Sequence, residues 1–165
     1  MPWFDSSTGK RPARNATARC SLATLLCLLI LAPGLAWSSP RETYGDIQGV
    51  VFRRATAPDV FIADLPGLPA VAGRQMEVRI RGLEAPAILG RCAREKRLAE
   101  QGRQVIELLL SRARQITLRD VGRDHTFRLQ AIVLVDGQNL GLILVKKHLA
   151  RWSGGPGPRV DWCAP

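Results

Sequence analysis

The sequence predicts one small domain of mainly β structure, in which helices pack against five short strands. Five segments alternate apolar and polar residues with a period of two, which is typical of strands. Two other segments repeat their apolar residues every three or four positions, which is typical of helices. The length of 165 residues suffices for a leader and one domain, which we place at residues 45 to 163.

Three strands are expected in the first half of the domain. Residues 49 to 55 and 59 to 65 both have strand character, and a short turn with Pro58 separates them. Two Pro and two Gly in residues 66 to 74 predict a loop. Residues 75 to 83 form the third strand, whose charged residues face away from its apolar ones.

The second half begins with a change of period. Residues 93 to 115 predict a long amphipathic helix with Arg and Glu on its solvent face. Residues 116 to 124 predict the fourth strand and a turn, and residues 126 to 135 the fifth strand, whose apolar face begins with Phe127. An Asp-Gly turn follows, and an asparagine can then cap a second helix over residues 140 to 150.

This order of elements suits a five-stranded OB-fold barrel with two or three helices packed against it. One helix falls between the third and fourth strands, and another follows the fifth. A plain α+β sandwich would give the same order and stays open. Residues 151 to 165 form a tail rich in Gly and Pro.

The first 39 residues differ from the rest and predict an export signal. Four basic residues precede an apolar run from Cys20 to about Ala32, and small residues follow that run. These are the features of a secretory signal, with cleavage after Ala36 or after Ser38. The run is short for a helix that crosses a bilayer, which needs about 20 residues. We therefore expect a periplasmic or secreted protein, with an uncleaved N-terminal anchor as the alternative.

Without the leader, the chain is still basic and retains two cysteines. The formal charge of the whole chain is +10, and the chain after residue 39 carries 20 Lys and Arg against 13 Asp and Glu, a charge of +7. This excess fits a polyanionic partner, or merely a soluble surface. Cys92 and Cys163 suggest one disulfide in an exported chain, and two unpaired buried thiols are the alternative.

Several stretches, in their order and spacing, resemble the thermonuclease family, which is also called staphylococcal-nuclease-like. These stretches are VRIRGLEAPA, GRCAREKRLAEQGRQVIELLL, GRDHTFRLQAIVLVDGQNLGLILVKKHLA and the closing WC. The resemblance runs from about Gly49 to Cys163. It implies an OB barrel, Ca²⁺-dependent hydrolysis of phosphodiesters in DNA and RNA, and a disulfide between Cys92 and Cys163, as in exported members.

The resemblance also implies a calcium site. Calcium is a hard cation that takes carboxylate and carbonyl oxygens. Asp59 and Glu84 match the family's calcium carboxylates, with Glu84 standing where the family usually has Asp, and Ala85 matches the residue that lends its carbonyl oxygen. Ala57 and Val60 replace an Asp and a Thr of the family's first motif.

Arg79 and Arg128 match the two arginines that bind the scissile phosphate and act in catalysis. Guanidinium groups suit that task because their paired donors neutralise the negative charge of the transition state. The position of the general base, however, holds Ala87. Neither Glu77 nor Glu95 is an obvious replacement, and loss of a general base costs a factor of about 10² to 10⁴ in rate. Hydrolysis is therefore expected to be weakened or lost.

Three functions are compatible with these residues. The first is an exported nuclease of reduced activity, which keeps its metal and phosphate contacts. The second is a non-catalytic OB-fold module that binds nucleic acid or another anionic partner. The third is a structural domain that makes only protein contacts. Ala87 and Val60 favour the second or third, whereas Arg79, Arg128 and Asp59 argue against the third.

Overall fold

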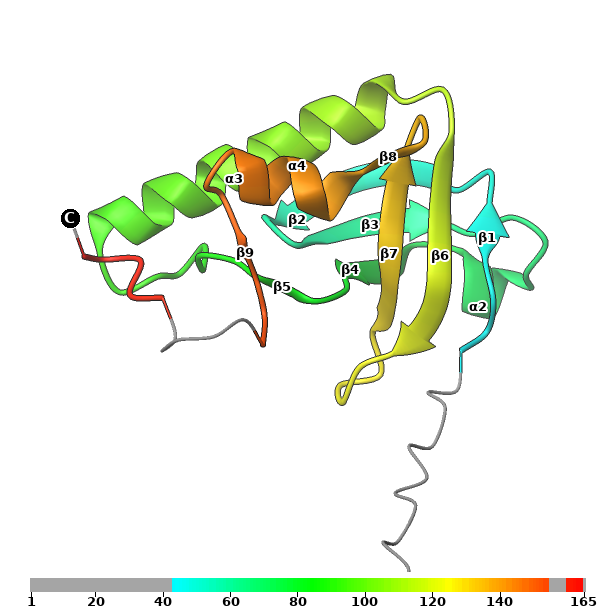
Figure 1. Ribbon diagram of the computed structural model, residues 1–165. Helices are drawn as coiled ribbons and strands as arrows, with labels where there is room; N and C mark the ends of the chain where they lie inside the picture. Colours follow the sequence, from blue (N-terminus) through cyan, green and yellow to red (C-terminus); the bar gives the residue numbers. More distant parts are fainter. Residues whose placement is uncertain (1–42, 155–159, 165) are drawn as a thin grey trace, which may run out of the picture. The chain divides into compact units, whose positions relative to one another are not determined.

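The computed structural model describes residues 43 to 154 and 160 to 164 (Figure 1). The leader expected at residues 1 to 39, with both cleavage positions, lies outside the described residues. The described part is a mixed α/β fold with a curled sheet and three helices. Within these ranges, no helix combines the length and the apolar character that crossing a bilayer requires.

The main sheet is open and runs in the order β1-β6-β7-β4-β3-β2. Its pairings are antiparallel, except that β4 and β7 run parallel, and a short strand, β8, pairs with β7. Among the described residues no pairing joins β2 back to β1. The strands are β1 (Ile47–Gln48), β2 (Val51–Ala57), β3 (Val60–Asp64), β4 (Met76–Ile80), β6 (Ile116–Arg123), β7 (Leu129–Val135) and β8 (Gln138–Asn139).

In the described residues, three helices accompany the sheet: α2 (Ala70–Gly73), α3 (Ala93–Arg112) and α4 (Leu140–Lys146). Helix α3 packs along β2 (Figure 1). Its contact with the turn between β2 and β3 is close, because a Cβ on Gly102 would lie 2.6 Å from the Cβ of Pro58. Helix α4 is capped as expected, since the Asn139 side chain accepts a hydrogen bond from the Leu142 amide.

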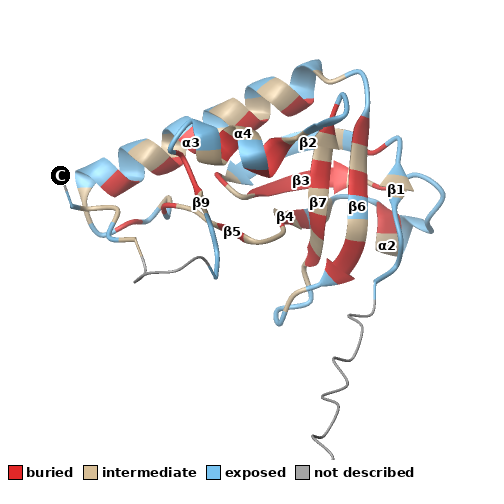
Figure 2. Ribbon diagram, in the orientation of Figure 1, coloured by how far each residue is buried: buried red, intermediate tan, exposed pale blue. Residues whose placement is uncertain are grey.

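The core lies between the curled sheet and the buried faces of α3 and α4 (Figure 2). Strand β7 shows the pattern most clearly, because its buried residues alternate with partly exposed ones. Phe127 does not join this face, contrary to the alternation, because the chain enters β7 only at Leu129. The largest fully buried apolar side chains are Phe61, Ile80, Ile106, Leu110, Leu118, Leu140 and Leu144.

The structure also departs from the expected elements before β4, at the end of α4 and in the tail. The loop expected at residues 66 to 74 contains the single-turn helix α2, which begins directly after Pro69. Helix α4 is shorter than expected because His148 adopts the left-handed conformation, with φ of +57°. The Gly- and Pro-rich tail contains a strand, β9 (Arg151–Trp152), which pairs antiparallel with β5 (Leu83–Glu84).

Candidate phosphate-binding site

A pocket of about 520 Å³ brings together four residues that the sequence marked as functional: Asp59, Arg79, Ala85 and Arg128. Asp59 comes from the turn before β3, Arg79 from β4, and Arg128 from the residue before β7. We call this pocket the arginine pocket. Its remaining lining is mostly small or apolar: Thr56, Ala57, Val60, Pro86, Ala87, Ile88 and Leu89.

The strand register explains why the two arginines line the same pocket. Strand β4 pairs with β3 and β7, so it lies between them in the sheet. Arg79 is opposite Val60 on β3 and opposite Gln130 on β7, two residues beyond Arg128. Because successive side chains of a strand alternate between its faces, Arg128 is expected on the same face as Gln130, and therefore beside Arg79.

Arg79 is oriented by Asp59. Its Nε donates a hydrogen bond to Asp59 Oδ2 at 3.0 Å, and the two side chains retain 29% and 13% of their exposure. The backbone carbonyl of Asp59 in turn accepts a hydrogen bond from the amide of Ile80, at 2.8 Å. This pair holds the guanidinium at the pocket wall and leaves part of it accessible to an anion.

Arg128 is held by an acid that sequence reasoning missed. Asp124 Oδ2 accepts a hydrogen bond from Nε of Arg128 at 2.9 Å and forms an ion pair with Nη2 at the same distance, and Glu77 Oε1 lies 3.7 Å from Nη1. The Asp124 side chain is only 4% exposed, whereas that of Arg128 is 29% exposed. The signal was present in the sequence, since Asp124 stands four residues before Arg128 in one of the stretches quoted above.

Asp124 also fixes the turn that leads into β7. Its Oδ1 accepts hydrogen bonds from the amide and hydroxyl of Thr126 and from the amide of Arg128. Burial by itself raises the pKa of Asp124, but these three bonds and the one from the Arg128 guanidinium lower that pKa well below its ordinary value. The carboxylate is therefore ionised at neutral pH and holds both the turn and Arg128.

Replacing Asp124 by Asn is expected to lower the free energy of unfolding at neutral pH by about 2 kcal/mol, because hydrogen bonds to a charged acceptor are lost. Because the pKa of Asp124 is lower in the folded state, its ionisation stabilises the fold fully at pH values above its unfolded-state pKa of about 4. That contribution is lost as the pH falls toward the folded-state pKa. Urea midpoints measured at pH 7 and pH 3 should therefore differ less in Asp124→Asn than in the natural protein. Equal differences would contradict this role.

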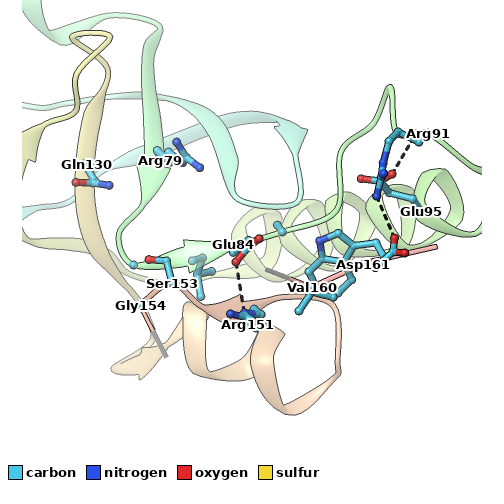
Figure 3. Close-up of a pocket in the computed structure, with 14 residues that line it drawn as sticks. Arg79, Glu84, Arg91, Glu95, Gln130, Arg151, Ser153, Gly154, Val160 and Asp161 are labelled. Carbon is cyan, nitrogen blue, oxygen red and sulfur yellow. Dashed lines mark hydrogen bonds and ion pairs between the residues drawn. The ribbon is translucent and has the colours of Figure 1, made fainter. Parts of the chain in front are cut away.

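Glu84 does not line the arginine pocket. It lines a neighbouring pocket of about 1070 Å³, which we call the tail pocket because residues 153, 154 and 160 to 162 form part of its wall (Figure 3). There Glu84 Oε2 lies 3.4 Å from Arg151 Nε, since the two residues are opposite each other in the β5–β9 pairing. Arg79 and Ala85 line both pockets.

The types of donor fit the calcium site implied by the resemblance, but their arrangement favours weak binding. Asp59 and Glu84 offer carboxylate oxygens, and Ala85 offers its carbonyl, all of which suit calcium. Each carboxylate already pairs with an arginine, so a cation has to compete with a guanidinium on both sides.

Ala87 lines the arginine pocket, as the resemblance implies, and it is exposed there. Its amide donates a hydrogen bond of 3.3 Å to Glu95 Oε1, and the amide of Arg91 donates one of 2.8 Å to Glu95 Oε2. Glu95 is only 8% exposed and fills the space beside Gly90, where a Cβ would lie 2.5 Å from its carboxyl carbon. Glu95 thus anchors the loop and lines the tail pocket, where Figure 3 shows it beside Arg91.

A disulfide joins Cys92 and Cys163, with their Cα atoms 6.0 Å apart. It attaches residues 160 to 164 to the start of α3, and an ion pair of 3.0 Å between Arg91 and Asp161 lies beside it. The ligand atoms of Cys92, Glu95 and Cys163 lie within 4.8 Å of one another. Because the two sulfurs are bonded to each other, this group is a covalent link and not a calcium site.

No family model matches the chain, and no curated protein matches it. The features of this chain that bear on function are the stretches that resemble the thermonuclease family and the meeting of Asp59, Arg79 and Arg128 in the arginine pocket.

Proposed function

We propose that this protein is an exported, thermonuclease-like domain that binds the phosphodiester backbone of nucleic acid and hydrolyses it weakly or not at all. The observation that carries the proposal is the arginine pocket, which Arg79, Arg128 and Asp59 line together with Ala87. In this proposal the curled sheet is an open form of the five-stranded OB barrel, with β2, β3, β4, β6 and β7 as its strands.

The electrostatics support phosphate binding. Both guanidinium groups are positioned by acids and remain 29% exposed, so each can turn donors toward an anion in the pocket. The charge of +7 on the chain after the predicted leader adds a long-range attraction for a polyanion. A purely structural domain would need neither the convergence of the arginines nor this charge.

The same residues support weak hydrolysis. In the proposal, Asp59, Glu84 and the Ala85 carbonyl would hold calcium, which when bound would neutralise charge on the phosphate. The chain's own residues would bind and orient that phosphate through Arg79 and Arg128. The methyl group of Ala87 cannot accept a proton from water, and Glu95 is engaged with backbone amides. We therefore expect the protein to bind nucleic acid but to cleave its phosphodiester bonds slowly or not at all.

Export is the cellular part of the proposal. The predicted leader supports it, and so does the disulfide, because such bonds persist in oxidising compartments outside the cytosol. Nucleic acid outside the cytosol would then be the natural ligand.

Replacing either Arg79 or Arg128 by Gln is expected to weaken binding of a fluorescent single-stranded oligonucleotide by about tenfold at 0.1 M salt, a value typical for loss of a charged hydrogen bond. The slope of log affinity against log salt should fall by about one for each arginine. Fluorescence anisotropy, with calcium and with a chelator, measures both quantities.

The matched control is Arg112→Gln, at the opposite end of the 20-residue helix α3 from the loop that carries Ala87. It removes one exposed charge and should leave affinity nearly unchanged. Equal effects of all three substitutions would show that binding depends only on the overall positive charge. That result would contradict phosphate binding in the arginine pocket. Absence of binding by the natural protein at low salt would favour the structural role instead.

A further inference from the structure

Phe127 is a large aromatic residue in an unusual position. It lies in the turn between β6 and β7, directly before Arg128, and it is 78% exposed. The apolar pattern assigned it to the core, but the turn keeps it out of β7 and leaves its ring exposed. A single exposed apolar residue needs no explanation by itself. Two further observations give this one a meaning.

The first is the backbone. Phe127 has φ of +64°, in the left-handed region that favours glycine. The turn enforces this conformation, because the Phe127 amide donates to the Asp124 carbonyl at 3.0 Å and the Phe127 carbonyl accepts from Arg123 Nη1 at 2.6 Å. Such conformations persist where the surroundings over-determine them, and they gather at ligand-binding sites.

The second is the neighbouring pocket, which combines charge with apolar surface. Arg128 provides the charge, and on the loop that carries Ala87 the apolar residues Ile88 and Leu89 line the same pocket, with Leu89 93% exposed. A ligand that fits both kinds of surface has an anionic group joined to a flat apolar one. A nucleotide has this composition, and its base can stack on an aromatic ring whatever its identity.

We propose that Phe127 stacks on an unpaired base of the strand whose phosphate Arg128 holds. Consecutive Cα atoms are about 3.8 Å apart, so a base on Phe127 and a phosphate on Arg128 can belong to the same or adjacent nucleotides. Bases in a duplex are already stacked and paired, and the protein therefore prefers single strands. This inference rests on the proposed function and adds the form of nucleic acid that the site selects.

The test is Phe127→Gly, which removes the ring and suits the left-handed backbone, so the variant keeps its fold and its melting temperature does not fall. Affinity is measured by anisotropy for two single strands of equal length, one ordinary and one with abasic spacers in place of its nucleosides. We expect the variant to bind the ordinary strand roughly 5- to 100-fold more weakly and the abasic strand as the natural protein does. The salt slope should not change, because no charge is removed.

Two matched variants complete the design. Phe127→Tyr keeps a ring and should retain the affinity, and Val71→Ala truncates a side chain that is 92% exposed on α2 and should leave it unchanged. Equal losses of Phe127→Gly on the ordinary and abasic strands, or no loss on either, overturn the stacking role while nucleic-acid binding stands. A natural protein that binds neither strand overturns both proposals.

Discussion

Replacing Ala87 by Glu is expected to raise the rate of calcium-dependent cleavage of single-stranded DNA by about 10² to 10⁴-fold over the natural protein, the range that a general base contributes. Ala87 lines the arginine pocket and is exposed, so a longer side chain enters the pocket without displacing the core. Its backbone amide is held by Glu95, which fixes the position from which the new carboxylate would reach a water molecule. Cleavage is followed on a labelled oligonucleotide with millimolar calcium.

The control for this substitution is Ala87→Gln, which adds nearly the same volume but no base. It should cleave no faster than the natural protein. Adding Arg128→Gln to Ala87→Glu should remove most of the gain, because the phosphate would lose one of its two guanidinium contacts. If Ala87→Glu folds and binds the strand but cleaves no faster than Ala87→Gln, the missing general base does not explain the weak hydrolysis. The resemblance to the thermonuclease family would then not support a nuclease function.

Replacing both Cys92 and Cys163 by Ser is expected to lower the free energy of unfolding by about 4 kcal/mol. The disulfide closes a segment with a sequence separation of 71, and the chain-entropy relation gives about this value for such a loop. Serine at position 92 preserves the helix cap, because the Cys92 sulfur now accepts a hydrogen bond from the Glu95 amide and a hydroxyl can do the same. Urea unfolding at neutral pH measures the loss.

A reducing dithiol separates the covalent link from the substitutions themselves. It should lower the urea midpoint of the natural protein to that of the double variant and leave the double variant unchanged. A natural protein with the same midpoint before and after reduction would show that the disulfide adds no stability.

The sequence predicted the five principal strands and the long helix because each has a strong apolar period and clear turn residues around it. It did not predict the pairing of β5 with β9, because that contact joins Glu84 to a Gly- and Pro-rich segment 67 residues later. It misplaced Phe127 because the alternation of apolar and polar residues extends from the strand back into the turn. In the structure, hydrogen bonds to Asp124 hold the backbone of this turn outside the strand.

For the site, the resemblance predicted that Arg79 and Arg128 would contact one phosphate, and the structure places both side chains at one pocket with Asp59. Arg79, Arg128 and Asp59 share a pocket because three strands pair in one register. Glu84 lies beside Arg151 because β9 pairs with β5, and no local sequence pattern predicts this partner. Asp124 was overlooked because an acid in a turn is ordinary until its burial is known.

The parallel pairing of β4 with β7 limits how this chain can change in length. Inserting or deleting one residue within β4 would exchange its two faces, sending Arg79 inward and an apolar residue outward. Residues 66 to 74 lie between β3 and β4 in sequence and take no part in the pairing of β4 with β7, so we expect extra residues, or even new chain ends, to be accepted there while the arginine pocket survives.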